Sequence, residues 1–168
     1  LRGNYNLKIA EYSESNFNYI QSRLTAQNLS KIDFLKINEK GEIINSREKF
    51  DIIYCIQSIE EYPKEEILIS EIKKLCKKET YIVFSIRNLL SWYGIQFYLK
   101  TRRNQVPNFG PHIPLNSFGI LNKIKKQYDL VETYGVSPTP RMPGKKINSP
   151  ILKYFCRLLV IVCKVKEI

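Results

Sequence analysis

The segment Phe50–Pro63 constrains the fold of this chain more than any other stretch. It opens with an acidic step, continues through five consecutive apolar residues and ends on polar Gln57 and Ser58. A short apolar run without alternation is typical of a strand that is buried on both faces of a parallel sheet. Ligands of open α/β sheets bind beyond the carboxyl ends of such strands. We therefore expect Cys55, Ile56 and Gln57 to lie beside a small-molecule site.

Charge and composition limit the partners of the chain. Its 168 residues suffice for one domain with a substantial core, and 43% hydrophobic and 26% charged residues are ordinary for a globular protein. The formal net charge of +11 indicates either a nucleic-acid or acidic-membrane partner, or a lysine-rich composition spread over solvated helix faces. Because the cations occur as scattered doublets such as Lys73-Lys74 and Lys145-Lys146, the second interpretation is favoured.

The cysteines and the apolar segments exclude other classes of protein. The sequence has four cysteines without a CxxC pair and a single histidine, so we expect neither a structural zinc site nor a disulfide framework. Reduced, buried thiols in a cytoplasmic protein fit this pattern. The most apolar segment, Leu158–Cys163, is too short to cross a bilayer, and we find no signal peptide.

Hydrophobic periodicity predicts alternating strands and helices. Strands are expected over residues 7–12, 31–37, 50–56 and 80–86, with helices over 15–26 and from Pro63 onward. After Asn88 the chain becomes apolar and aromatic, and then rich in loops. We expect a helix from Asn116 or Ser117 to Lys126, and strands over 130–136 and 158–165 that form an antiparallel edge pair. The alternation indicates a single α/β domain over residues 1–168.

In this order the elements resemble the class I S-adenosylmethionine-dependent methyltransferases of the small-molecule type. Residues 7–13 are similar to the family's second strand, and residues 32–38 to its third. Phe50–Pro63 resembles the fourth strand with the turn after it, residues 80–88 the fifth, and residues 159–165 the last strand. The resemblance implies a Rossmann-like, mostly parallel sheet with helices on both faces and an antiparallel C-terminal edge strand.

The same resemblance implies a cofactor, S-adenosylmethionine, and places residues around it. Glu11, followed by Tyr12, stands where the family has the acidic residue that holds the ribose hydroxyls of the cofactor. Asn38 stands where an aspartate usually accepts from the adenine amino group, and Cys55, Ile56 and Gln57 would line the cofactor. Other interpretations stay open: Glu11 caps the next helix, Asn38 is an ordinary turn residue, and Cys55 and Ile56 are core.

Further residues are candidates for the acceptor side of the site. The resemblance implies transfer of the methyl group to an O, N or C atom of a small-molecule acceptor. His112, the only histidine, is either a general base or an exposed loop residue. Residues 89–118 and 137–150 are expected to cover the acceptor. The residues expected to contact it are Glu61, which stands where relatives often have a histidine, Arg87, Asn88, Trp92 and Tyr93.

One departure from the family pattern leaves two explanations. The family's first strand and the glycine-rich turn after it should precede Glu11, but the residues before Glu11 contain only Gly3. The sequence is then either the C-terminal part of a longer methyltransferase, which we favour, or a relative that no longer binds the cofactor. The rival functions are a nucleic-acid methyltransferase, although Gln57-Ser58 stands where an Asn/Asp-Pro-Pro-Tyr motif would be, and a non-catalytic binding module. Neither the acceptor nor the oligomeric state has a signature in the sequence.

Overall fold

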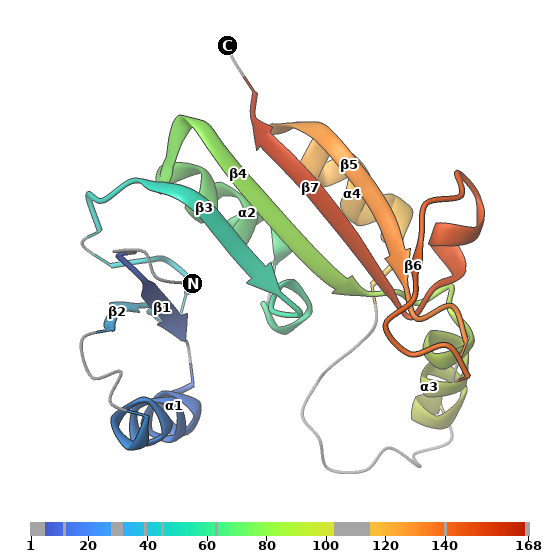
Figure 1. Cartoon of the computed structure of the whole chain (residues 1–168), viewed down its shortest axis with the longest axis horizontal. Helices are drawn as coiled ribbons and strands as arrows, with labels where there is room; N and C mark the ends of the chain where they lie inside the picture. Colours follow the sequence, from blue (N-terminus) through green and yellow to red (C-terminus); the bar gives the residue numbers. More distant parts are fainter. Residues whose placement is uncertain are drawn as a thin grey trace. The chain divides into compact units, whose positions relative to one another are not determined.

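The structure, a computed structural model, divides the chain into two compact units, Leu1–Glu48 and Lys49–Ile168 (Figure 1). It describes residues 6–11, 13–27, 32–38, 40–44, 46–62, 64–102, 115–139 and 141–166. No helix among these residues has the length and apolar content that crossing a membrane requires. The two units are described in turn below.

The unit Leu1–Glu48 is a strand–helix–strand crossover. Strand β1 (Lys8–Glu11) pairs in parallel with β2 (Asp33–Lys36), and helix α1 (Glu14–Ala26) connects them. The helix begins after Ser13, whose hydroxyl accepts from the Asn16 amide at 3.4 Å, as an N-cap serine does. The Phe17 and Phe34 rings lie 4.5 Å apart, so α1 packs on β2 through Phe17.

The unit Lys49–Ile168 is built on a five-stranded mixed sheet in the order β3-β4-β7-β5-β6. Its strands are β3 (Phe50–Ile56), β4 (Cys76–Arg87), β5 (Tyr128–Val136), β6 (Lys146–Ile147) and β7 (Leu158–Val165). Strands β3 and β4 are parallel, whereas β7 runs antiparallel to both β4 and β5.

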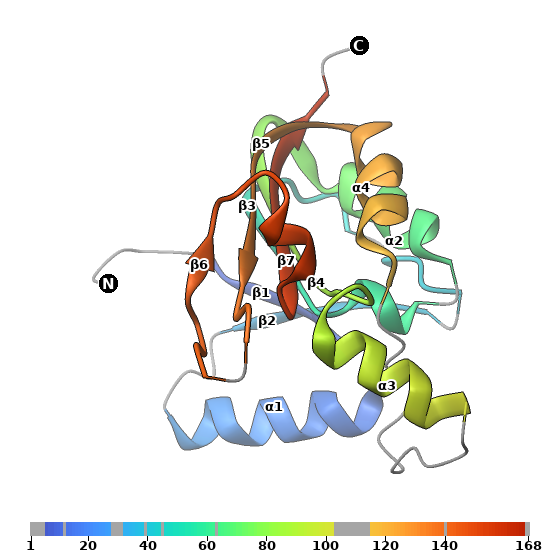
Figure 2. The same ribbon diagram turned by 90° about the vertical axis from the view of Figure 1, so that its right-hand side faces the viewer.

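Two helices, α2 (Glu65–Lys74) and α4 (Ser117–Lys125), lie against the same face of this sheet (Figures 1 and 2). Tyr128 ties the layers together: its hydroxyl donates to the Ile69 carbonyl of α2 at 2.7 Å, and its ring packs on Phe84. Between sheet and helices lies one apolar core, formed by Cys55, Leu68, Ile69, Ile72, Ile82, Phe84, Ile86, Ile120, Leu121, Ile124, Leu159, Ile161 and Cys163, among others.

Three further elements lie at the carboxyl ends of β3 and β4 or beyond them. They are the single-turn helix η1 (Ile59–Glu61), helix α3 (Trp92–Arg102) and the single-turn helix η2 (Leu152–Phe155). Figure 2 shows α3 below the sheet and η2 directly above α3.

The α/β class and the antiparallel C-terminal strand are confirmed, but the position of that strand was predicted wrongly. Strand β7 lies inside the sheet, between β4 and β5, and the short strand β6 forms the edge beyond β5. The physical reason lies in its composition, because Leu159, Val160 and Ile161 are all buried and an edge strand would expose such a run. A helix on the sheet face opposite α2 and α4 stays a prediction.

Candidate functional site

Gln57 directs the carboxyl end of β3 toward β4. Its backbone is left-handed, with φ of 50°, a conformation that residues other than glycine rarely adopt. Its amide donates to the Ser85 carbonyl at 2.8 Å, and its side-chain oxygen accepts from Arg87 Nε at 2.9 Å. Strained backbone of this kind persists only where its surroundings hold it, and it is common at functional sites. Gln57 thereby fixes the plane of the Arg87 guanidinium at the end of β4.

Glu60 also holds the carboxyl end of β4, at Arg87. It is buried in η1, and its carboxylate accepts from the backbone amide of Arg87. Burial, together with the charge of Glu60, raises the pKa of the neighbouring Cys55 thiol to about 12. The sequence analysis singled out the adjacent Glu61, whose side chain lies outside the described residues. No local signal in the sequence identifies Glu60 as a buried residue.

Asn88 braces the end of β4 from inside the protein. Its amide nitrogen donates to the Tyr154 and Cys156 carbonyls, and its oxygen accepts from the Leu90 amide at 3.1 Å and from the Ser117 hydroxyl at 2.7 Å. These four bonds engage both donors and both lone pairs of the side-chain amide. The structure therefore gives Asn88 a bracing role, while the predicted contact with an acceptor stays untested.

Helix α3 starts immediately beyond this brace. The Ser91 hydroxyl donates to the Asn88 carbonyl at 2.7 Å and accepts from the Gly94 amide at 3.0 Å. A side chain at Gly94 would meet the Asn88 carbonyl oxygen at 2.3 Å, so only glycine allows this close approach. Trp92 is exposed, and the Arg157 guanidinium lies over the Tyr93 ring, 4.9 Å from its centroid.

In the unit Leu1–Glu48 two of the three predicted cofactor residues, Glu11 and Asn38, form local hydrogen bonds. Glu11 ends β1, and one of its carboxylate oxygens accepts from the Ser13 amide at 2.8 Å. The Asn38 side-chain oxygen accepts from the Lys40 and Glu42 amides at 3.0 and 2.9 Å, which closes a turn after β2. The alternative interpretation of Asn38 as a turn residue thus describes what it does here, and its adenine contact stays a prediction.

Of the remaining candidates, two lie on β3 and two lie outside the described residues. Cys55 is buried against α2 and α4, whereas Ile56 points to the other face of the sheet and is half exposed. Tyr12 and His112 lie outside the described residues. Within the described ranges, no three side chains of histidine, cysteine, aspartate or glutamate come together as a metal site would require.

Solved structures with the same fold include methyltransferases. No family model matches the sequence, and neither does any curated protein. A structure from Thermotoga maritima, described as a SAM-dependent methyltransferase and possible histamine N-methyltransferase, superposes with a TM-score of 0.74 at 13% identity, over 95% of this chain and 73% of that one. A SAM-dependent methyltransferase from Clostridium acetobutylicum gives 0.64 at 11% identity, over 97% and 76%.

A third structure contains a product of the cofactor. The N-methyltransferase NodS from Bradyrhizobium japonicum, in complex with S-adenosyl-L-homocysteine, superposes with a TM-score of 0.60 at 11% identity, over 96% of this chain and 67% of that one. At such identities the likeness establishes the fold and leaves the chemistry to the site. The chain therefore has the Rossmann-like α/β fold of the class I S-adenosylmethionine-dependent methyltransferases.

Proposed function

We propose that this protein transfers the methyl group of S-adenosylmethionine to an O, N or C atom of a small-molecule acceptor. The observation that carries the proposal is the polar cluster of Gln57, Glu60 and Arg87 at the carboxyl ends of two parallel strands, within a methyltransferase fold. Ligands of open α/β sheets bind at this edge. Bound S-adenosylmethionine supplies an electrophilic methyl group on a sulfonium.

The residues proposed to bind this cofactor have suitable hydrogen-bonding groups. Glu11 is a carboxylate at the end of a parallel strand, and its acceptor-only oxygens have about four lone-pair sites, of which the Ser13 amide takes one. We propose that it accepts from both ribose hydroxyls, with Tyr12 beside it and Asn38 near the adenine. Ile56 and Gln57 would flank the cofactor, with Cys55 behind them in the core.

Arg87 gives the acceptor side of the site its charge. Its Nε bond to Gln57 orients a planar guanidinium that can bind a carboxylate or a phosphate with two parallel hydrogen bonds. We propose that the acceptor carries such an anionic group. Trp92 and Tyr93 would wall the acceptor, segments 89–118 and 137–150 would cover it, and Asn88, Glu61 and His112 would lie around it. Methyl transfer from a sulfonium requires mainly alignment, so these residues would act by positioning the acceptor.

Isothermal titration of S-adenosylmethionine tests the cofactor assignment, with the protein expressed together with any residues encoded before Leu1. Glu11→Ala should weaken binding by about ten- to a hundredfold, because it removes charge-assisted hydrogen bonds. The matched control is Glu14→Ala, an exposed carboxylate on the first turn of α1 in the same unit, which should bind like the wild type. Equal binding by wild type and Glu11→Ala would show the ribose assignment to be wrong.

A further inference from the structure

Two long segments of the chain contain cations and no acids. The chain has 16 acidic residues, yet none of them lies within residues 80–128 or 133–166. In the unit Lys49–Ile168 these segments supply α3, α4, β6 and η2. Exposed or half-exposed cations of α3, η2 and the neighbouring turns are Lys100, Arg141, Lys145, Lys153 and Arg157. The end of the unit beyond β4 is therefore positively charged, because the two segments that form it contain no carboxylate.

Large apolar side chains are exposed at the same end. On α3, Trp92 is 61% exposed, and Ile95 and Leu99 are also exposed, at the i, i+3, i+7 spacing of one helix face. Ile151, which directly precedes η2, is 69% exposed, and Leu152 and Phe155 of η2 are exposed with it. We refer to these six apolar residues and the five cations above as the apolar–basic surface.

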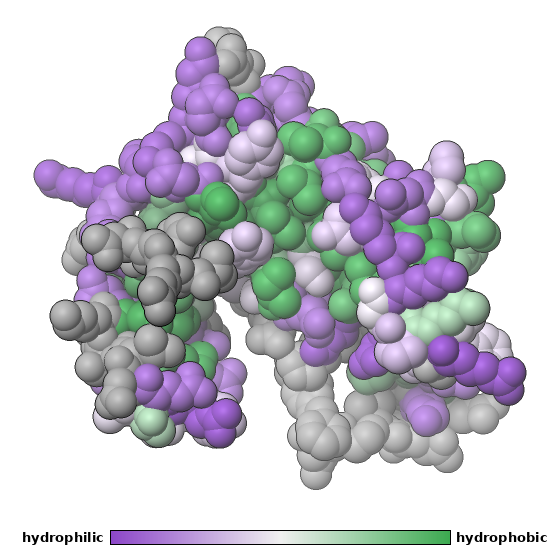
Figure 3. All heavy atoms as spheres, viewed as in Figure 1, coloured by the Kyte–Doolittle hydropathy of each residue, from purple (hydrophilic) through white to green (hydrophobic). Residues whose placement is uncertain are grey.

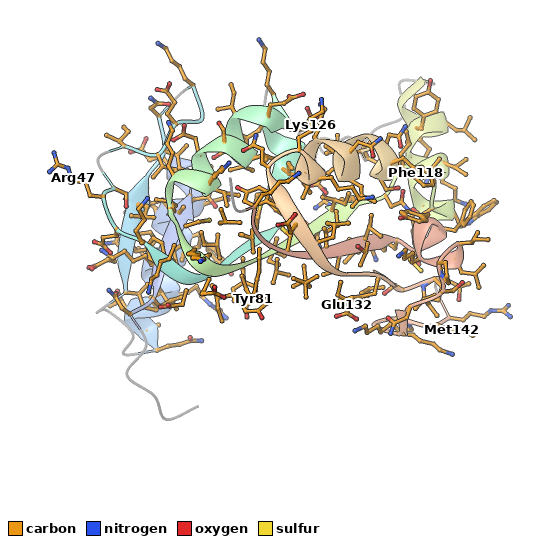
Figure 4. The ribbon with its side chains drawn as sticks, turned by 90° about the horizontal axis from the view of Figure 1, so that it is seen from above. Arg47, Tyr81, Phe118, Lys126, Glu132 and Met142 are labelled. Carbon is orange, nitrogen blue, oxygen red and sulfur yellow. The ribbon has the colours of Figure 1, made fainter. Side chains whose placement is uncertain are left out.

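Contacts of residues in or next to the two elements hold α3 and η2 at the same end of the unit (Figure 2). The Arg157 guanidinium covers the Tyr93 ring of α3, and Asn88, which follows β4, donates to the Tyr154 carbonyl of η2. Phe118 stacks on Tyr154 with ring centroids 4.5 Å apart. Figure 4 shows Phe118 and Met142 toward the end of the unit that carries α3, and Lys126 and Tyr81 farther from it.

We propose that the apolar–basic surface docks on the anionic phospholipid surface of a membrane. Exposed apolar patches rimmed by polar residues mark interaction sites, and cations beside tryptophan, phenylalanine and leucine are the combination found in elements that lie in the membrane interface. Basic residues are attracted to anionic headgroups, while tryptophan and tyrosine prefer the headgroup level. A nucleic acid fits the surface less well, because its protein interfaces are polar and Ile95, Leu99, Ile151 and Leu152 offer neither hydrogen bonds nor stacking.

The protein contains its own probe for this proposal, because Trp92 is its only tryptophan. Vesicles of phosphatidylcholine mixed with phosphatidylglycerol should shift the Trp92 emission to the blue and carry the protein down in sedimentation. Pure phosphatidylcholine vesicles should bind it far more weakly, and salt should reverse the binding as it screens the cations. Equal binding to both kinds of vesicle, or binding to neither, would overturn the proposal.

Two pairs of matched variants separate the surface from net charge and from general hydrophobicity. Ile151→Ser with Leu152→Ser should weaken vesicle binding by about tenfold or more, because two side chains no longer enter the interface, whereas Val131→Ser, an exposed apolar position on β5, should not. Arg141→Gln with Lys145→Gln should weaken binding more than Lys125→Gln with Lys126→Gln, which removes the same charge at the C-terminus of α4. Equal losses of vesicle binding in the two charge variants would show that only the net charge of the protein matters, and would refute the docking proposal.

Two further measurements keep the outcomes distinct. Thermal unfolding followed by circular dichroism identifies any variant that fails to fold. Titration of S-adenosylmethionine should be unaffected by Ile151→Ser with Leu152→Ser, which lie outside the segments proposed to cover the acceptor, so failure of the docking proposal and failure of the cofactor assignment are distinguishable. If a single-stranded RNA oligonucleotide shifts the Trp92 emission with the same variant dependence, the surface belongs to a nucleic acid and the membrane proposal is wrong.

Discussion

The two faces of the five-stranded sheet differ sharply, although neighbouring residues of the same strands form them. On the covered face Ile82, Phe84 and Ile161 are completely buried under α2 and α4. On the opposite face, which we call the open face, Tyr54 is 67% exposed, and Ile52 and Ile56 are half exposed. Figure 3 views the unit from the open face and shows hydrophobic residues gathered over the strands.

This difference shows what a strand with two apolar faces does and does not determine. The register places Ile52 opposite Tyr81 and Tyr54 opposite Val83, so the open face is as apolar as the covered one near β3 and β4. Parallel strands are usually buried on both faces, and their sequences are therefore apolar on both faces. Stability, however, comes only from the area that is removed from water, and within this unit the helices supply it on the covered face.

The largest effect is expected from opening the covered face. Phe84→Ala removes a fully buried ring that contacts Tyr128 and should lower the free energy of unfolding by about 3–5 kcal/mol. Urea unfolding followed by circular dichroism measures the change. A loss below about 1 kcal/mol would mean that the core between sheet and helices is not the main source of stability.

Alkaline pH should act on the covered face through its buried thiols. Burial raises the pKa of the Cys55 and Cys163 thiols from 9.0 to about 12, and the pKa of the Tyr128 hydroxyl is raised as well. In the unfolded chain these thiols ionise near pH 9, so their contribution to stability is complete below pH 9 and is lost as the pH rises toward 12.

The measurement is the free energy of unfolding in urea under reducing conditions, at a pH below 9 and at several values above it. The double variant Cys55→Ala with Cys163→Ala should be less stable at neutral pH and should lose less stability as the pH rises. If its pH dependence equals that of the wild type, the buried thiols are not the groups that titrate.

A smaller effect is expected where the covering helices contact each other at the surface. Lys123 of α4 reaches Glu65 and Glu66 of α2 at 2.9 and 2.8 Å, and these carboxylates raise its pKa. Because the pair is partly exposed to solvent, Lys123→Met should cost about 0.5–1 kcal/mol at low salt and less at high salt. Lys125→Met on the same helix is the control, and a salt-independent loss would contradict the electrostatic cause.

The smallest effect is expected on the open face. Tyr54→Ser changes a residue that is next to buried Cys55 on the same strand but mostly in water, so the free energy of unfolding should change by less than about 0.5 kcal/mol. The same urea titration applies. A loss comparable to that of Phe84→Ala would show that the open face is covered in solution, and the comparison of the two faces would fail.

The sequence by itself determined the elements whose signals are local. The strands over 50–56 and 158–165 were predicted with the boundaries that the structure has, because each contains at least five consecutive apolar residues. The starts of α1 and α4 were also predicted, since Ser13 and Asn116 accept from amides only two or three residues ahead of them. The order of the elements along the chain sufficed to indicate the methyltransferase fold.

Only the tertiary structure decided which of these elements are neighbours and what each polar residue does. The tertiary structure places β7 between β4 and β5 and buries Glu60, whose carboxylate accepts from the Arg87 amide. It also brings the Asn88 side chain to the carbonyls of Tyr154 in η2 and of Cys156, which lies between η2 and β7. Asn88 and Tyr154 are 66 positions apart, and no periodicity or spacing reports such a bond. The physical reason is that a local pattern fixes backbone conformation and burial, whereas the partner of a buried polar group is set by packing that brings distant segments together.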